Sequence, residues 1–327
     1  MPTLLRRTPV RLLVFSLLAG LIALPAAAAA QDEGTGGRLG LPDGWAPEGI
    51  TSLDGSLYAG SLADGAIWQV DPATGEGGIL VPGANGAVSV GLDGDADTGR
   101  LWVAGGRTGQ IHAYDATSGE ELGDWVLDAG FLNDVAVAPD AVYVTDSFLP
   151  QLVILPTPEG GSLDEVEVVA LPITGDLEYG EGFNLNGIVA TEAGLVVIHS
   201  PTGALYALDP ETGVTTLIDT GDAQLSAGDG LELSASPTGD SLILYVVRNQ
   251  LNEVAALDLE PDLSAATFVA STTSDDLDIP TTSALVGNDL WLVNARFGTP
   301  VTPDTEYWIS RLDAAWWTLS MPEESDS

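Results

Sequence analysis

The sequence predicts an all-β fold, a six-bladed β-propeller in which an N-terminal strand closes the last blade. Two strands joined by a Gly turn recur at constant spacing, and a third strand ending in an apolar-x-apolar-Asp pattern recurs every 41 to 55 residues. Helical periodicity, with an apolar residue at every third or fourth position, is missing from these units. Six units of this length built from short strands are typical of a radial propeller.

The first thirty residues have the pattern of an export signal. Arg6, Arg7 and Arg11 precede an apolar run over residues 12–24 and then an alanine tract. Gly and Pro interrupt the apolar run too early for a membrane-spanning helix. We therefore expect a signal peptide over about residues 1–30 and a secreted protein, extracellular or periplasmic. The Arg6-Arg7 pair leaves both general and twin-arginine export open.

The mature chain is expected to form one domain. A flexible, Gly- and acid-rich leader covers residues 31–38, the propeller covers residues 39–321, and an acidic tail covers residues 322–327. No change in composition marks a second domain between the leader and the tail. All-β architectures often hold this length as a single unit.

The strands of each blade can be placed from the repeat. The third strands end at Asp71, Asp115, Pro156, Asp209, Asp258 and Asp313. Outer strands are expected at residues 78–81, 122–127, 166–171, 214–218 and 266–270. In the sixth unit both residues 315–319 and residues 38–42 are candidates for the outer strand. We expect the N-terminal segment to complete this blade, because closing the ring hides sheet edges that would otherwise pair with other chains.

The composition excludes several classes of partner. The chain has 48 acidic residues against nine basic ones, all arginine, and removing the signal leaves six arginines and a formal charge of −42. Such a surface repels nucleic acid and anionic membranes and attracts cations. Solubility at high ionic strength is an equally simple reason for the charge. Without cysteine there is neither a disulfide framework nor an acylated lipoprotein anchor, so we expect a mature protein without an acyl anchor. We also expect a monomer.

The residues that open the inner strands carry the functional signal. Inner strands of a propeller surround a central channel, so their first residues gather at one mouth. These opening residues are Glu48, Val90, Asn133, Asn186, Asp229 and Thr282. Two carboxylates and two amide oxygens suit an oxygen-binding divalent cation, most simply Ca²⁺, with Glu48, Asn133, Asn186 and Asp229 as ligands. With two His and no Cys, zinc and copper are disfavoured. The alternative is that these are strand-initiating turn residues without a metal.

The loops after the second strands should open on the same mouth. They lie ten residues before each third-strand end, which places Asp146 and His199 at this register. We expect substrate contacts from Asn133, Asp146, Phe148, His199, Asn249 and Asn294. For His199, local hydrogen bonding is an alternative, whereas His112 lies inside a third strand and is expected to be structural.

These motifs resemble those of a known family. Pro47-Glu48-Gly49-Ile50, Asn133-Asp134-Val135, Asn186-Gly187-Ile188 and Asp229-Gly230-Leu231 are similar to the metal-site motifs of the regucalcin/gluconolactonase family. This resemblance implies a calcium-dependent six-bladed propeller that hydrolyses lactones. It implies that Glu48, Asn186 and Asp229 are metal ligands and Asn133 a further ligand or substrate contact. Sugar-lactone hydrolases of the family have an Arg where this chain has Phe131, so a more apolar lactone or ester is expected.

The hypothesis is metal-assisted hydrolysis in which Asp229 directs water onto the carbonyl carbon. Asp134, Asp146 and His199 are alternative bases. A second hypothesis is a non-catalytic extracellular binding or scaffold propeller that holds a structural calcium ion. A third is superoxide dismutase, the label given to some secreted relatives of this kind. Two histidines and no cysteine disfavour the redox centre that a dismutase requires.

Overall fold

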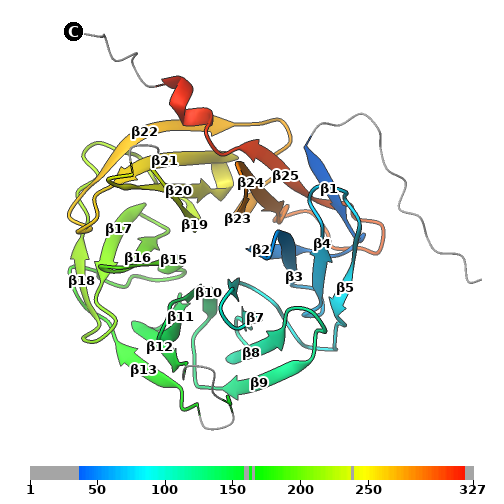
Figure 1. The fold of residues 1–327 in the computed structure, drawn as a ribbon. Coiled ribbons are helices and arrows are strands. Elements are labelled where there is room, and N and C mark those ends of the chain that lie inside the picture. The colour runs from blue at the N-terminus through cyan, green and yellow to red at the C-terminus, as the bar shows by residue number, and fades with distance from the viewer. Residues whose placement is uncertain (1–36, 158–161, 164–165, 237–238, 321–327) are drawn as a thin grey trace, which may run out of the picture. The chain divides into compact units, whose positions relative to one another are not determined.

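A computed structural model of the protein describes residues 37–157, 162–163, 166–236 and 239–320. They form six sheets arranged as blades around a central axis, which confirms the predicted six-bladed propeller (Figure 1). The predicted signal peptide, most of the predicted leader and the predicted acidic tail lie outside the described residues. In the described part of the chain, no helix combines the length and apolar character that crossing a membrane requires.

The first three blades each contain four strands. Blade 1 consists of β2 (Pro47–Leu53), β3 (Ser56–Ser61), β4 (Ile67–Val70) and β5 (Gly77–Val81). Blade 2 consists of β6 (Leu92–Asp95), β7 (Arg100–Ala104), β8 (Gln110–Asp115) and β9 (Glu121–Val126). Blade 3 consists of β10 (Leu132–Val137), β11 (Ala141–Asp146), β12 (Gln151–Pro156) and β13 (Val169–Pro172).

The other three blades follow the same plan with two additions. Blade 4 consists of β15 (Leu185–Thr191), β16 (Gly194–His199), β17 (Ala204–Leu208) and β18 (Val214–Leu217), with the short β14 (Thr174–Gly175) parallel to β18. Blade 5 consists of β19 (Gly228–Ala235), β20 (Leu242–Arg248), β21 (Glu253–Leu259) and β22 (Ala266–Thr273), with the 3₁₀ helix η1 (Asn249–Leu251) after β20. Blade 6 contains β23 (Pro280–Val286), β24 (Asp289–Asn294) and β25 (Tyr307–Asp313).

The N-terminal strand β1 (Arg38–Leu41) closes blade 6, as predicted. It pairs antiparallel with β25, from Arg38 opposite Ser310 to Leu41 opposite Tyr307. The competing C-terminal segment forms the 3₁₀ helix η2 (Trp316–Ser320), because β1 already occupies the free edge of β25. Trp317 of this helix is buried and donates a hydrogen bond to the hydroxyl of Tyr245, 3.2 Å away.

The outer strand of blade 3 begins later than predicted. It starts at Val169 and pairs with β12, whereas strand structure was expected from Val166. The Trp125 indole of blade 2 donates a hydrogen bond to the Val166 carbonyl at 3.1 Å. That carbonyl therefore bonds to the neighbouring blade instead of to β12.

The core lies between adjacent blades. All six residues of β11 are buried, and so are six consecutive residues of β20. Each sheet packs against a neighbour on both faces, so its second strand is buried on both sides. This continuous burial is why the second strand of each unit appears in the sequence as an uninterrupted apolar run.

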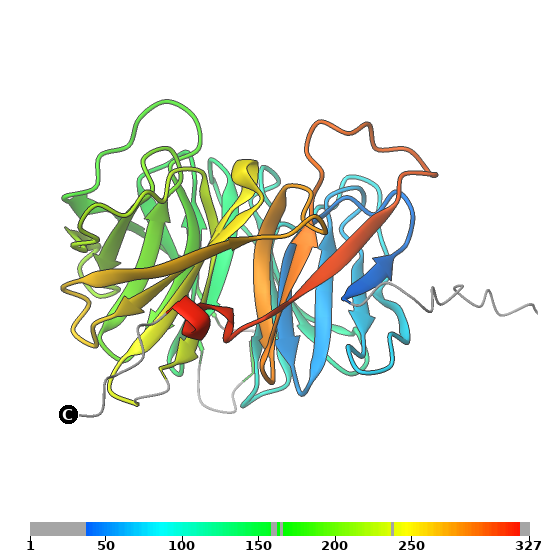
Figure 2. The same cartoon turned by 90° about the horizontal axis from the view of Figure 1, so that it is seen from above.

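One face of the wheel carries the long loops. Figure 2 shows the loops before β15 and β25 rising from the same face as η1. The inner strands β2, β10, β15, β19 and β23 begin on this face. It is called the mouth face below.

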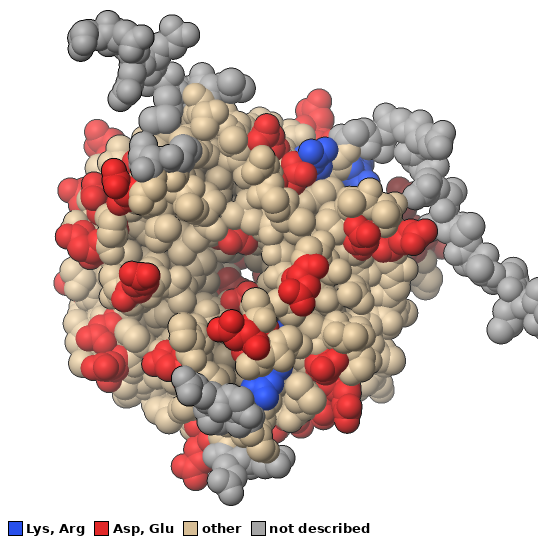
Figure 3. Space-filling model, in the orientation of Figure 1, with Lys and Arg blue, Asp and Glu red and all other residues tan. Residues whose placement is uncertain are grey.

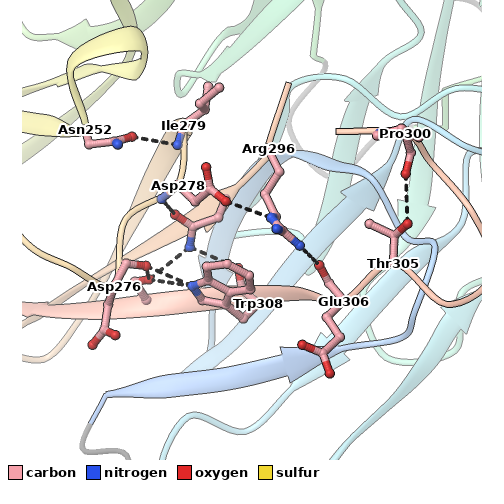
Figure 4. Close-up of polar contacts among 11 residues, drawn as sticks. Asn252, Asp276, Asp278, Ile279, Arg296, Pro300, Thr305, Glu306 and Trp308 are labelled. Atoms are coloured by element: carbon pink, nitrogen blue, oxygen red, sulfur yellow. Dashed lines mark hydrogen bonds and ion pairs between the residues drawn. The ribbon is translucent and has the colours of Figure 1, made fainter. Parts of the chain in front are cut away.

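A polar network fixes the loop before β25 (Figure 4). The Arg296 guanidinium donates to the Asp278 carboxylate at 2.8 Å and to the Glu306 carbonyl at 2.7 Å, and it lies 5.0 Å from the Trp308 ring centroid. The Ile279 amide donates to the Asn252 side chain at 2.7 Å. Asn252, Ile279 and Arg296 all have φ between 51° and 54°, a left-handed conformation that non-glycine residues adopt only where their surroundings hold it.

Candidate functional site

A β-bulge lies at the opening residues in five of the six blades. The register of the inner strand shifts between Pro47 and Ile50 in blade 1, and the other shifts occupy the same place. They lie between Leu132 and Val135, Leu185 and Ile188, Gly228 and Leu231, and Pro280 and Ser283. A bulge adds a residue to one strand and turns its side chain away from the regular pleat. The repeat therefore sets the opening residues apart from the other residues of their strands.

Glycine next to an opening residue lets adjacent inner strands approach closely. A Cβ added to Gly49 would lie 2.3 Å from the Val90 carbonyl oxygen, and one added to Gly187 would lie 2.3 Å from the Asp229 carbonyl oxygen. A Cβ on Gly230 would lie 2.8 Å from the Thr282 Cα. Only glycine allows this contact without displacing the neighbouring backbone. The recurring x-Gly dipeptide is thus explained by packing between blades.

The remaining opening residues complete the ring. The Gly91 amide donates to the Asn133 carbonyl at 2.8 Å. The Thr145 hydroxyl donates to the Asn186 carbonyl at 2.8 Å, and the Thr281 hydroxyl to the Glu48 carbonyl at 2.5 Å. The structure therefore brings all six opening residues together around the axis. Whether four of them bind a metal stays a prediction.

Two buried carboxyl groups in this ring, Glu48 and Asp229, lie close enough for their negative charges to repel. Glu48 is 7% exposed and Asp229 is 2% exposed. Burial raises the Glu48 pKa well above its usual range, and the charges of Asp229 and Asp134 raise it further. Burial also raises the pKa of Asp229 to about 7, although hydrogen bonds from Asn249 and Asn186 oppose the rise. Both groups are ionised at neutral pH only at a cost that a cation would remove.

The hydrogen bonds of these two groups differ. The Asn249 amide donates to Asp229 Oδ2 at 2.6 Å. The Glu48 carboxylate accepts no hydrogen bond from any residue that the structure describes. An ionised carboxylate buried without a donor requires some positive partner.

The donor set fits an oxygen-binding cation. Among the described residues, no three His, Cys, Asp or Glu side chains are grouped closely enough to hold a metal. A cation here would therefore rely on Glu48 and Asp229 together with the neutral oxygens of Asn133 and Asn186 and with water. Such mixed oxygen ligation, containing few charged groups, is common for Ca²⁺.

A second group of buried carboxyls, here called the clamp carboxyls, consists of Asp93, Asp134 and Glu232. Asp93 accepts the Val137 amide at 2.8 Å, and Asp134 accepts the Ile188 amide at 3.3 Å. Glu232 accepts the backbone amides of Leu233 and Leu285. These bonds join blade 2 to blade 3, blade 3 to blade 4, and blade 5 to blade 6. Burial is the main reason that the pKa of Asp93 is raised and that those of Asp134 and Glu232 rise to about 8.

The clamp carboxyls line a cavity of about 180 Å³ in the channel. Figure 3 shows the face opposite the mouth, where a central opening has acidic side chains beside it. Sequence reasoning missed Asp93 and Glu232. Their register was the available signal, because each lies three residues after an opening residue, as does Thr51, which donates to Asp93 at 3.1 Å. A larger open groove of about 710 Å³ lies away from the axis, between residues 219–224 and β22.

Three predicted contact residues are engaged in local structure. Asp146 accepts backbone amides of Gly130, Phe131, Phe148 and Leu149 and the side-chain amide of Gln151, at 2.8 to 3.0 Å. Asn294 is fully buried; it accepts the Asp278 amide and donates to Trp308 and Ser310. His199 contacts the Thr202 hydroxyl at 2.8 Å and the Asn184 side chain at 3.3 Å, and burial lowers its pKa. These contacts favour the alternative of local hydrogen bonding for His199, and a role in ordering loops for all three.

Phe148 belongs to an aromatic cluster, here called the aromatic rim, with Phe131 and Phe183. The Phe148 and Phe183 ring centroids are 4.7 Å apart, and those of Phe131 and Phe183 are 5.1 Å apart. The Arg107 guanidinium lies 4.7 Å from the Phe148 ring centroid. Arg107 was missed, although it follows Gly105 by two residues just as Phe148 follows Asp146. His112 contacts Glu121 at 3.2 Å and stacks on Tyr114 in its third strand.

Solved structures similar to this chain share the propeller architecture. The Malassezia sympodialis allergen Mala s 1 is 14% identical, with a TM-score of 0.67 over 85% of this chain and 96% of its own. Staphylococcus aureus virginiamycin B lyase is 13% identical, with a TM-score of 0.55 over 78% of this chain and 80% of its own. Kuenenia stuttgartiensis hydrazine synthase is 14% identical, with a TM-score of 0.52 over 86% of this chain and 99% of its own.

These likenesses show the fold alone. Neither a protein-family model nor a curated protein matches the sequence. The similar structures include an allergen, a lyase and a synthase, so the shared architecture does not select a reaction. A function for this chain has to be argued from its own side chains.

Proposed function

We propose that the protein is a secreted, calcium-dependent hydrolase of lactones or related esters, of the kind found in the gluconolactonase-like propellers that its motifs resemble. The observation that carries the proposal is the pair of buried carboxyl groups, Glu48 and Asp229, in a ring that also contains Asn133 and Asn186. Burial and mutual repulsion disfavour two negative charges here unless a cation is present.

Glu48, Asn133, Asn186 and Asp229 would hold the calcium ion. When bound, a divalent cation supplies a Lewis acid that polarises a carbonyl oxygen and stabilises the negative charge developing on it. The four side chains contribute two negative charges and two neutral oxygens. Because Ca²⁺ takes about six to eight oxygen ligands, positions would remain for water and for a carbonyl oxygen.

Asp229 is the residue proposed to accept a proton from the attacking water. Burial raises its pKa to about 7 in the metal-free protein, and a bound cation would lower it, so the carboxylate is ionised and can accept a proton at neutral pH. The Asn249 amide, 2.6 Å from Oδ2, fixes the orientation of the carboxylate. Proton transfer to Asp229 leaves hydroxide to attack the carbonyl carbon, after which the ring or ester C–O bond breaks and the departing oxygen is protonated.

The mouth favours an apolar substrate. Phe131 replaces the Arg that sugar-lactone hydrolases of the resembled family have at this position, and its ring packs against Phe148 at a centroid distance of 5.9 Å. The free energy of binding would then come from burying apolar area. Aryl esters and alkyl or aryl lactones fit such a surface better than gluconolactone.

A panel of lactones and aryl esters, assayed with and without a chelator, tests the proposal. We expect turnover that the chelator abolishes and added calcium restores, with higher kcat/KM for apolar substrates than for gluconolactone. Full turnover after exhaustive chelation would contradict the metal requirement. Absence of turnover across the panel in calcium-loaded protein would contradict the hydrolase.

The second candidate function is a non-catalytic binding or scaffold propeller with a structural calcium ion. One observation favours it: Asp146, His199 and Asn294 are all committed to local hydrogen bonds, which leaves few free groups for catalysis beside Asp229. Calcium-dependent melting without any turnover is its expected signature. If calcium neither raises the Tm nor supports turnover of any substrate in the panel, both functions are excluded.

A further inference from the structure

We infer that Arg107 and the aromatic rim form a binding site for aromatic carboxylates, with the carboxylate on Arg107 and the ring on the phenylalanines. Aromatic carboxylates are the acids that hydrolysis of esters of aromatic acids would release, and to that extent the inference rests on the proposed function. Binding at the rim itself requires neither calcium nor hydrolysis. The two can therefore be tested separately.

The rim adjoins the ring of opening residues through Ser147. The Ser147 amide donates to the Phe131 carbonyl at 2.9 Å, and the Asn184 amide, next to Phe183, donates to the Ser147 carbonyl at 2.9 Å. The Asn133 side chain donates to the Ser147 hydroxyl, also at 2.9 Å. One serine thus connects the backbone of the rim with an opening residue, so a molecule on the rim lies beside the channel mouth.

The rings offer an apolar surface that the protein leaves open. Phe183 is 45% exposed, and Phe131 and Phe148 are partly exposed. The three rings meet in edge-on or tilted arrangements, with centroids 4.7 to 5.9 Å apart. Such a cluster accepts a further aromatic ring at its exposed side.

Arg107 supplies the positive charge. It is exposed, and its guanidinium lies 4.7 Å from the Phe148 centroid and 6.0 Å from the Phe131 centroid. Within the described residues it forms no ion pair or hydrogen bond, whereas Arg38, Arg248, Arg296 and Arg311 each contact a carboxylate. The chain has 48 acidic residues, so the lack of a carboxylate partner distinguishes Arg107 from these four arginines.

The stacked arginine in blade 6 shows what Arg107 lacks. Arg296 also lies over an aromatic ring, but Asp278 and the Glu306 carbonyl take its N–H groups (Figure 4). Arg107 keeps the stacking and leaves its N–H donors free. A guanidinium presents these donors in a planar fork that matches the two oxygens of a carboxylate.

Charge and shape together select the ligand class. A free anion approaching this acidic surface is repelled everywhere except near an unpaired cation. A neutral aromatic molecule would use only the rings, and a small aliphatic acid only Arg107. An aromatic carboxylate uses both, which predicts tighter binding than either half alone.

Titration of calcium-loaded protein with 2-naphthoate, followed by protein fluorescence or calorimetry, tests the inference. We expect saturable binding that Arg107→Gln weakens about tenfold, the loss typical of a hydrogen bond to a charged group. The matched control is Arg311→Gln, which removes the same charge from an exposed arginine paired with Asp289 and should leave binding unchanged. 2-Naphthamide should bind wild type more weakly than 2-naphthoate and should be insensitive to Arg107→Gln.

Phe183→Ala gives a second measurement. It should weaken 2-naphthoate and 2-naphthamide by the same factor, because it removes the shared ring contact and keeps the charge. Three results would overturn the inference: wild type binds no 2-naphthoate, the two arginine variants lose affinity equally, or the Arg107→Gln variant binds like wild type. Binding of 2-naphthoate to calcium-loaded protein that turns over no substrate of the panel would support the rim and contradict the hydrolase, so the two failures are distinct.

Discussion

The two groups of buried carboxyls in the channel differ in their partners. Each clamp carboxyl, Asp93, Asp134 or Glu232, accepts at least one backbone amide from the next blade. At the mouth, Asp229 accepts side-chain amides, and Glu48 accepts no hydrogen bond from the described residues. The same residue types, buried in one channel, therefore have different contacts at its two levels.

The difference separates groups that hold the fold from groups that remain available. A backbone amide between blades needs an acceptor whether or not a ligand is present, so the clamp carboxyls contribute to folding in every state. Among the described residues, the mouth carboxyls Glu48 and Asp229 accept no backbone amide with their side chains. Their burial is useful only if something else, such as a cation or a substrate, contacts them.

The largest expected effect is the loss of turnover in Asp229→Asn. The amide keeps the size of the side chain but cannot accept a proton, so kcat/KM should fall by about 100-fold or more, the usual contribution of a positioned base. Glu232→Gln is the matched control, because it replaces a buried carboxyl at the clamp level by an amide of the same size. Both variants are assayed on the best ester of the panel. An equal fall in kcat/KM would show that the carboxyls at the mouth and the clamp carboxyls do not differ in function.

Next in size is the response to calcium. Free calcium at about 100 times its dissociation constant should stabilise wild type by about 2.7 kcal/mol, visible as a higher Tm. Glu48→Gln should lose most of this response, whereas Asp93→Asn should keep it. Calcium titrations followed by thermal unfolding provide the measurement. A Glu48→Gln protein with the wild-type calcium response would place the ion elsewhere.

A smaller effect is expected on the stability of metal-free protein. Asp93→Ala leaves the Val137 amide of blade 3 without its acceptor and removes the contact with Thr51, so the free energy of unfolding should fall by about 2 kcal/mol. Urea unfolding measures this loss. Glu48→Ala is the comparison, and it should destabilise the metal-free protein less because no hydrogen bond is broken. The reverse ranking would show that the mouth carboxyls support the fold.

The sequence predicted the blades and the opening residues because both come from a repeat. Strand order, blade number and closure by Arg38–Leu41 follow from periodic apolar runs and from the need to cover a sheet edge. The bulges are invisible in the sequence, yet they fall at the opening residues, and in three blades an x-Gly dipeptide there marks the close contact between blades. Register was therefore a sufficient guide to which residues meet.

Register was an insufficient guide to what each side chain does. Asp146, His199 and Asn294 occupy the expected loops but are held by loop hydrogen bonds, and no repeat distinguishes a loop-ordering Asp from a substrate-binding one. Arg107 and Phe183 come from different blades and both contact Phe148, and these contacts depend on loop conformations outside the repeat. Partners of this kind are set by three-dimensional packing and had no signal in spacing alone.

Per pH unit, the smallest expected effect is the pH dependence contributed by Glu232. Its pKa is raised from 4.5 to about 8 in the folded protein, mainly by burial. The folded state therefore holds this proton more tightly than the unfolded state, so the contribution to stability is full below pH 4.5 and is lost as pH rises to about 8. In metal-free protein the free energy of unfolding should fall across this range, by at most about 1.4 kcal/mol per pH unit for this group. Glu232→Gln cannot ionise and should flatten the slope measured by urea unfolding at a series of pH values. An unchanged slope in that variant would mean that Glu232 is already ionised in the folded channel, which its burial and its acidic neighbours argue against.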